Sequence, residues 1–298
     1  HYPLRRQRQM CIRDRYETVK ATFDEASQAL GYDLRALIDN DEEKLNETKY
    51  TQPAILTTSV AILRLLSENG IKPDLVAGLS LGEYSALVAS GIIDFQEAVK
   101  LVAKRGQYMT EAAPTGSGKM VAVMNTDPAL IEEICQKAAE FKGGIVSPAN
   151  YNTPAQIVIG GEVQAVDYAV ELLKEAGVRK LIELKVSGPF HTAILKPASE
   201  KLALELDKIN FRPFELPLIS NTSAKVMEND EVKGLLTRQV MEPVRFYESV
   251  ETMQKLGATR FIEVGPGRVL SGFIKKIDKN AEIANVENLA SFEALINQ

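Results

Sequence analysis

The pentapeptide Gly78-Leu79-Ser80-Leu81-Gly82 constrains the fold of this chain more than any other stretch of its sequence. Residues 73–77 before it predict a short buried strand, and residues 83–90 after it predict a helix that ends near Gly91. We expect glycine on both sides of the serine because a side chain there would collide with the neighbouring strand or helix. A strand, Gly-x-Ser-x-Gly and a helix in this order predict a nucleophile elbow, which exposes a serine hydroxyl. The alternative is a structural turn.

A nucleophilic serine needs a base that accepts its proton. The sequence holds two histidines, His1 and His191. His1 lies in no predicted element, whereas His191 follows the loop signal Gly188-Pro189 and precedes a helical pattern over residues 193–206. We therefore predict that His191 is the base for Ser80. The alternative is a packed or surface histidine with no catalytic role.

Composition narrows the class of protein. The 298 residues are 45% hydrophobic and 25% charged, which is typical of a globular chain, and the net charge of −5 argues against nucleic acid as a partner. No apolar run is long enough to cross a membrane. Cys11 and Cys135 form neither a disulfide framework nor a metal-binding spacing, and no phosphate-binding loop is present, so no cofactor and no metal are predicted. Without a signal-peptide pattern, a cytoplasmic location is expected.

Strands that alternate with helices predict an α/β fold with a mostly parallel sheet. Residues 118–186 differ, because their order of elements is β-α-β-β-α-β, which is ferredoxin-like. We therefore predict a large α/β domain from residues 1–117 and 187–298, with a ferredoxin-like subdomain inserted at 118–186. The subdomain's elements are expected at 119–124, 127–141, 144–149, 156–159, 162–176 and 179–186. The large domain's helices are expected at 18–30, 53–69, 95–113, 193–206, 232–239, 244–256 and 269–277, and further strands at 216–220 and 260–264.

Five motifs give the chain from Tyr16 onward a family resemblance. They are Gly78-Leu79-Ser80-Leu81-Gly82-Glu83-Tyr84, Lys104-Arg105-Gly106, Ala149-Asn150-Tyr151-Asn152, Pro189-Phe190-His191 and Glu263-Val264-Gly265-Pro266-Gly267. Their order and spacing resemble those of the malonyl-CoA:acyl carrier protein transacylases of bacterial type II fatty acid synthesis. The acyltransferase domains of fatty acid and polyketide synthases look similar. The resemblance implies an α/β-hydrolase-like parallel-sheet domain with an inserted ferredoxin-like subdomain.

The resemblance also implies an activity, a ping-pong transfer of a malonyl group. Ser80 would attack malonyl-CoA with His191 as base, and the phosphopantetheine thiol of acyl carrier protein would then take the malonyl group from the serine. Malonyl-CoA and acyl carrier protein are thus the implied partners, with no nucleic acid and no membrane. A monomer is the working expectation, and the choice between fatty acid and polyketide synthesis stays open.

Further site residues follow from the family's motifs. The resemblance implies that Arg105 pairs with the malonyl carboxylate, which suits a planar guanidinium; the alternative is a solvated helix residue or a structural ion pair. Gln239 matches the position whose backbone carbonyl orients the catalytic histidine, or it is an ordinary residue at a helix end. Asn150 lines the cleft or is structural. Phe190 before the histidine resembles the malonyl-preferring form of the synthase domains, which implies an unbranched substrate.

One position and one segment depart from the family pattern. Leu79 stands where the family usually has histidine. Residues 1–15 contain five arginines and no glycine, and they match neither the family's opening strand nor its Gly-Gln-Gly-x-Gln loop, whose glutamine N–H forms half of the oxyanion hole. The segment looks foreign to the rest of the chain, so we assign that role to neither Gln7 nor Gln9. The N–H of Leu81 would supply the other half of the hole.

Two other functions remain open from the sequence. One is a serine esterase or thioesterase that uses the same elbow, although Arg105 and the inserted subdomain argue against it. The other is a catalytically impaired protein that only binds acyl carrier protein. Because carrier proteins are acidic, we expect a local basic patch as the docking surface, with Arg268, Lys275 and Lys276 as candidates.

Overall fold

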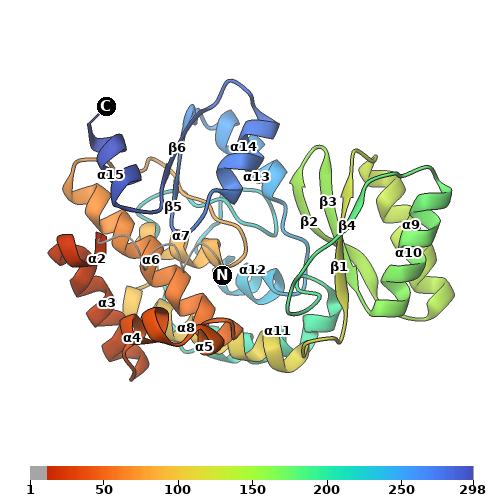
Figure 1. Ribbon diagram of the computed structural model, residues 1–298, viewed down its shortest axis with the longest axis horizontal. Helices are drawn as coiled ribbons and strands as arrows, with labels where there is room; N and C mark the ends of the chain where they lie inside the picture. The colour runs from red at the N-terminus through yellow and green to blue at the C-terminus, as the bar shows by residue number, and fades with distance from the viewer. Residues whose placement is uncertain (1–11, 298) are drawn as a thin grey trace. The chain divides into compact units, whose positions relative to one another are not determined.

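The structure is a computed structural model that describes residues 12–297 and shows a mixed α/β chain (Figure 1). It consists of two compact units. Unit 1 holds the described residues up to Gln107, Ile209–Ile219 and those from Met253 onward, and unit 2 holds Tyr108–Lys208 and Ser220–Thr252. The expectations for residues 1–11 lie outside the described residues. Within residues 12–297, no helix combines the length and apolar character needed to cross a membrane.

Unit 1 is mainly helical. Its helices are α2 (Ile12–Arg15), α3 (Glu17–Leu30), α4 (Leu34–Asn40), α5 (Glu42–Leu45), α6 (Thr48–Glu68), α7 (Leu81–Ala89), most of α8 (Phe95–Ala112), the end of α13 (Phe246–Lys255), α14 (Val269–Ile277) and α15 (Leu289–Ile296). The helix predicted over 18–30 is present as α3, and it ends before Gly31, whose φ of 78° lies in the left-handed region that favours glycine. Our prediction that α6 begins at Pro53 is wrong. The helix begins at Thr48, because Pro53 lies close enough to its start to remove only one early hydrogen bond.

The regular parallel strands of unit 1 form a single pair among the described residues. Strand β5 (Arg260–Val264) runs beside β6 (Glu282–Val286), with Arg260 opposite Glu282 and Val264 opposite Val286. The strands predicted at 73–77 and 216–220 are each reduced to one parallel bridge, Val76 to Leu218. That bridge still aligns the chain before Ser80, because the Val76 N–H donates to Pro217 and its carbonyl accepts from Ile219.

Unit 2 contains a four-stranded antiparallel sheet. Its strands are β1 (Lys119–Met124), β2 (Val146–Thr153), β3 (Gln156–Gly161) and β4 (Leu181–Glu183), in the spatial order β2-β3-β1-β4. The predicted order β-α-β-β-α-β is therefore present. Strand β2 extends further than predicted, and β4 is shorter than the predicted range 179–186. The shortening follows from pairing, since β4 is an edge strand with three partners on β1.

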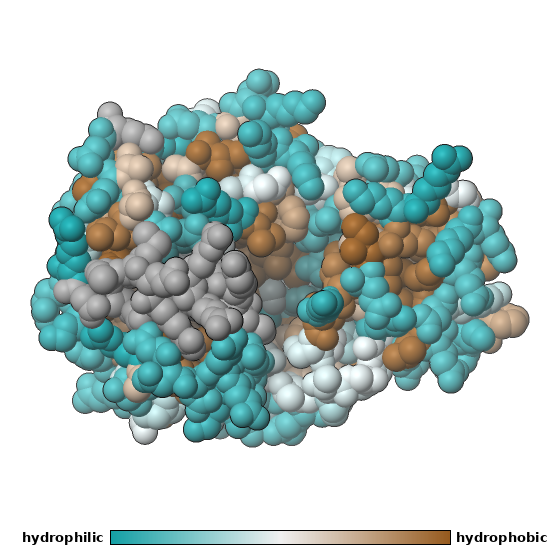
Figure 2. Space-filling model, in the orientation of Figure 1, coloured by the Kyte–Doolittle hydropathy of each residue, from teal (hydrophilic) through white to brown (hydrophobic). Residues whose placement is uncertain are grey.

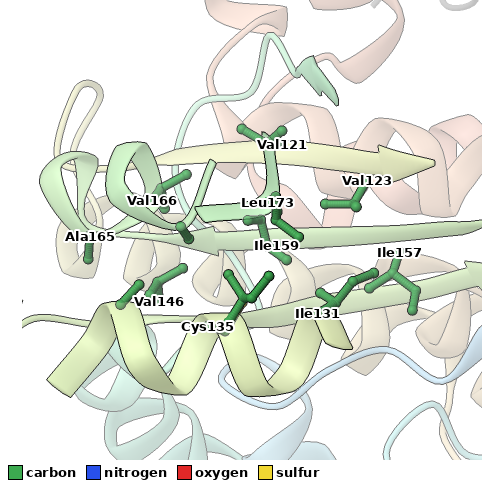
Figure 3. Packing of buried hydrophobic residues seen from close by; sticks show 13 residues of the cluster. Val121, Val123, Ile131, Cys135, Val146, Ile157, Ile159, Ala165, Val166 and Leu173 are labelled. Atoms are coloured by element: carbon green, nitrogen blue, oxygen red, sulfur yellow. The ribbon is translucent and has the colours of Figure 1, made fainter. Parts of the chain in front are cut away.

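Two helices cover one face of this sheet, α9 (Pro128–Lys142) and α10 (Val163–Glu175) (Figure 3). Alternate residues of β1, Val121 and Val123, point toward these helices. They belong to the same buried cluster as Ile131 and Cys135, which lie on one face of α9. The intervening residues, such as Ala122, belong to a second apolar cluster. On the side seen in Figure 2, hydrophobic residues gather over this sheet.

The rest of unit 2 consists of helices joined by irregular segments. One 3₁₀ turn, η1 (Ala193–Leu195), leads into α11 (Lys196–Leu206), which packs on α12 (Val232–Gln239). The predicted single helix over 193–206 is therefore two pieces. A hydrogen bond of 2.6 Å from the Ser199 hydroxyl to the Thr237 carbonyl joins α11 to α12. This packing fixes the end of α12, where the carbonyl of Gln239 contacts His191.

Candidate active site

Ser80 occupies a sharp turn directly before α7. Its backbone has φ 55° and ψ −106°, a conformation that costs a non-glycine residue of the order of 1–3 kcal/mol. A Cβ on Gly78 would lie 2.0 Å from the Gly82 carbonyl carbon, so only glycine fits at position 78. The expectation of a matching collision at Gly82 is wrong, because a Cβ there meets nothing within 4 Å. The turn thus needs one glycine for space, and it holds the serine in a strained conformation.

The side chain of Ser80 is hydrogen-bonded to Arg105 from α8. The Nη2 of Arg105 donates to Ser80 Oγ at 3.0 Å, and its Nη1 donates to Gln52 Oε1 at 2.9 Å. Arg105 is 1% exposed, and its guanidinium lies 5.2 Å from the ring centroid of Tyr84. Burial lowers the pKa of Arg105, while Tyr84 and Glu83 act against that shift. A cationic donor is therefore fixed at the hydroxyl of the elbow serine.

A close contact between α6 and α8 positions this arginine. A Cβ on Gly106 would lie 2.5 Å from the Thr48 carbonyl oxygen and 2.8 Å from the Lys49 Cα. Glycine at position 106 therefore lets the first turn of α6 approach α8 directly beside Arg105. The same contact brings Gln52 within hydrogen-bonding distance of the guanidinium.

In unit 2, His191 is held by the end of α12. Its Nδ1 lies 2.7 Å from the backbone carbonyl oxygen of Gln239, and its own N–H donates to the Val240 carbonyl at 3.0 Å. Gln239 is the last residue of α12, where the carbonyls point beyond the end of the helix, and its carbonyl accepts from the imidazole. Because a carbonyl only accepts, this contact assigns the proton of a neutral ring to Nδ1 and the lone pair to Nε2. His191 is 4% exposed and has φ 62°, so it too is a strained residue.

The other predicted residues have the following places. Leu81 is the first residue of α7, so its N–H lies at the start of that helix. Asn150 is a half-buried residue of β2 beside a register shift, and it pairs with Val244. Phe190 is half-buried in the turn before His191. Sequence reasoning missed Gln52. Its signal was a polar residue directly before Pro53 at the start of a nearly apolar segment.

The candidate docking residues lie on and beside α14. Lys275 and Lys276 are exposed in its last turn, and Arg268 precedes it. Arg268 forms an ion pair of 3.1 Å with Glu287. Of the three side chains, therefore, one already has an acidic partner in the chain itself. Across residues 12–297, no group of three or more potential metal ligands is present.

Comparisons with known proteins identify the class of protein. Residues 13–292 match the family described as acyl transferase domain. The chain is 46% identical to the malonyl CoA-acyl carrier protein transacylase of Bacillus subtilis (strain 168), over 94% of this chain and 90% of that protein. It is 48% identical to the protein of the same name from Escherichia coli (strain K12), over 88% and 85%. The chain is therefore an acyltransferase.

Solved structures agree with the sequence relatives. The crystal structure of MCAT from Streptococcus pneumoniae superposes with a TM-score of 0.95 at 65% identity, covering 97% of this chain and 94% of that one. A type II PKS acyl-carrier protein in complex with its malonyl-transacylase gives 0.91 at 43% identity, again covering 97% and 94%. This chain belongs to the malonyl CoA-acyl carrier protein transacylase family, which confirms the resemblance found in the motifs.

Proposed function

We propose that this chain transfers a malonyl group from malonyl-CoA to the phosphopantetheine thiol of acyl carrier protein through a malonyl ester of Ser80. Family membership supports the reaction. The observation that carries the assignment of residues is the buried guanidinium of Arg105 at hydrogen-bonding distance from the hydroxyl of the elbow serine. A cation at that position suits an acyl group that bears a carboxylate.

In the first half-reaction, Ser80 Oγ attacks the thioester carbon while the Nε2 of His191 takes the hydroxyl proton. The new C–O bond forms, the C–S bond breaks, and the CoA thiolate receives the proton from His191. The Gln239 carbonyl supports this role, because it keeps Nδ1 protonated and stabilises the imidazolium that forms transiently during the transfer. The N–H of Leu81 would donate to the oxyanion of the tetrahedral intermediate.

In the second half-reaction, the carrier-protein thiol gives its proton to His191 and attacks the ester carbon of malonyl-Ser80. The C–S bond forms, the ester C–O bond breaks, and His191 returns the proton to Ser80 Oγ. The chain is thereby restored without any other reactant. Lys275 and Lys276 offer positive charge on α14 to the acidic carrier protein.

Arg105 would select the acyl group by a paired hydrogen bond to the malonyl carboxylate. In the structure its Nη2 donates to Ser80 Oγ, so the arriving carboxylate would take over that donor. Hydrogen bonds to a charged group are worth about 1.5–3 kcal/mol each, enough to separate malonyl from acetyl substrates. Asn150 and Phe190 are proposed to line the substrate cleft.

At the level of the fold, we propose an α/β-hydrolase-like domain that carries a ferredoxin-like subdomain over residues 118–186. The antiparallel order β2-β3-β1-β4 with α9 and α10 on one face supports the second part. The parallel pair β5 and β6 and the strand-like segment before Ser80 support the first.

Intact mass spectrometry after a brief incubation with malonyl-CoA tests the proposal. The parent should gain one malonyl group, and Ser80→Ala should gain none. Addition of holo acyl carrier protein should then remove the group from the parent. Loss of the group to water at the same rate without carrier protein would favour a thioesterase. A folded parent that binds carrier protein but forms no adduct would refute the catalytic assignment.

A further inference from the structure

We propose that Gln52 is a positioning residue that orients Arg105 for the substrate carboxylate and so contributes to the choice of a carboxylated acyl group. This inference rests on the proposed function. Gln52 is on α6, Arg105 is on α8, and the two side chains are 5% and 1% exposed. The amide oxygen of Gln52 accepts from Nη1 at 2.9 Å.

Two hydrogen bonds and one ring contact hold the guanidinium. Nη1 is held by Gln52, Nη2 points to Ser80, and one face of the group lies against the ring of Tyr84 at 5.2 Å. A planar group that is held at one nitrogen and over one face has little freedom to rotate. Gln52 is thus the contact that keeps Nη2 directed at the position where the acyl group reacts.

The chemistry of an amide explains why glutamine suits this position. A neutral oxygen accepts a hydrogen bond and leaves the positive charge of Arg105 for an incoming carboxylate. A glutamate in the same place would pair with the buried cation and compete with the substrate. An apolar side chain of the same length would leave Nη1 without this acceptor and let the guanidinium turn away.

The backbone supports the same interpretation. Gly106 allows the Thr48 carbonyl region of α6 to approach α8, and this approach sets the distance over which Gln52 must reach. Gln52 lies in the next turn of α6 after Thr48. The position of its side chain therefore depends on the helix contact and not on a flexible loop.

Two variants test the proposal, Gln52→Glu for charge and Gln52→Met for the loss of the acceptor. The matched control is Thr57→Val, a substitution of similar shape at a fully buried residue of the same helix. Its hydroxyl has no hydrogen-bond partner among the described residues. For each protein, the rates of Ser80 acylation by malonyl-CoA and by acetyl-CoA are followed by intact mass, and thermal unfolding is recorded alongside.

We expect Gln52→Glu to lower kcat/KM for malonyl-CoA by about 10–100-fold, in line with the strength of a hydrogen bond to a charged group. Gln52→Met should raise KM for malonyl-CoA by about 10-fold. Acylation by acetyl-CoA should change little in both variants, so the ratio of malonyl to acetyl rates falls. Thr57→Val should keep the parent ratio.

Equal losses for the two substrates, or an unchanged ratio in Gln52→Glu, would overturn the proposal while leaving the proposed function intact. A parent chain that fails to form malonyl-Ser80 would instead overturn the proposed function. A drop in unfolding temperature with an unchanged ratio would show that Gln52 is only structural. The ratio is therefore the deciding measurement.

Discussion

Replacing Gly106 with alanine tests how closely α6 and α8 approach each other. A Cβ at this position would lie 2.5 Å from the Thr48 carbonyl oxygen, 2.7 Å from its carbonyl carbon and 2.8 Å from the Lys49 Cα. All three are backbone atoms, so the clash is relieved only when the two helices move apart. Overpacking of this kind costs about 1–3 kcal/mol of unfolding free energy.

Gly272→Ala is the matched control. Gly272 lies inside α14, and a Cβ there would meet nothing within 4 Å. Alanine is favoured over glycine inside a helix by about 0.8–1.0 kcal/mol, and this gain applies to both positions. We therefore expect Gly272→Ala to stabilise the chain, whereas Gly106→Ala loses up to about 2 kcal/mol after the same gain.

Thermal unfolding of both variants beside the parent measures the difference. For chains of comparable size, 1 kcal/mol shifts Tm by about 2–4 °C, so the two variants should differ by about 2–12 °C. Gly106→Ala should also slow malonylation, because the shift moves Gln52 away from the guanidinium of Arg105. If Gly106→Ala were as stable as Gly272→Ala and fully active, the close contact between α6 and α8 and its role in positioning Arg105 would be refuted.

Three further outcomes are expected. Burial raises the pKa of the Cys135 thiol from 9.0 to about 12. Above pH ~9 the unfolded chain therefore loses a proton that the folded chain keeps, and the free energy of unfolding falls as pH rises toward ~12. Urea unfolding at two alkaline pH values should show a smaller fall in Cys135→Ala; an equal fall would contradict this. Lys275→Glu with Lys276→Glu should slow transfer to carrier protein but not self-acylation, and equal slowing of both steps would argue against docking there. His191→Ala should slow Ser80 acylation by about 10²–10⁴-fold while leaving the unfolding temperature near that of the parent, and a normal acylation rate would remove His191 from the mechanism.

Local patterns predicted most of the secondary structure. Strand β1, helix α12, strand β5 and helix α14 have the predicted bounds, because their apolar periodicity ends at clear turn residues. Strand β6 and helix α15 were not predicted. The five residues of β6 show no clear alternation, and its place beside β5 depends on pairing with a segment some twenty residues earlier.

The candidate site likewise contains residues that local motifs predicted and one that they did not. Ser80, Arg105 and His191 stand in short motifs, so the sequence alone indicated them. Gln52 does not, because its contact with Arg105 joins residues 53 positions apart. It arises from two helices that a glycine brings together, and no local pattern encodes such a contact.

The positive φ angles of Ser80 and His191, 55° and 62°, bear on how a duplicated copy of this protein would evolve. Each angle suits glycine better than the residue present, so the two groups proposed to do the chemistry are held at the expense of stability. Ser80→Gly should therefore give an inactive chain that unfolds at a higher temperature. A duplicate copy released from selection for activity would be expected to accept glycine at these two positions early, since glycine relieves the backbone strain. Its descendants would keep the fold and grow more heat-resistant as they ceased to be enzymes.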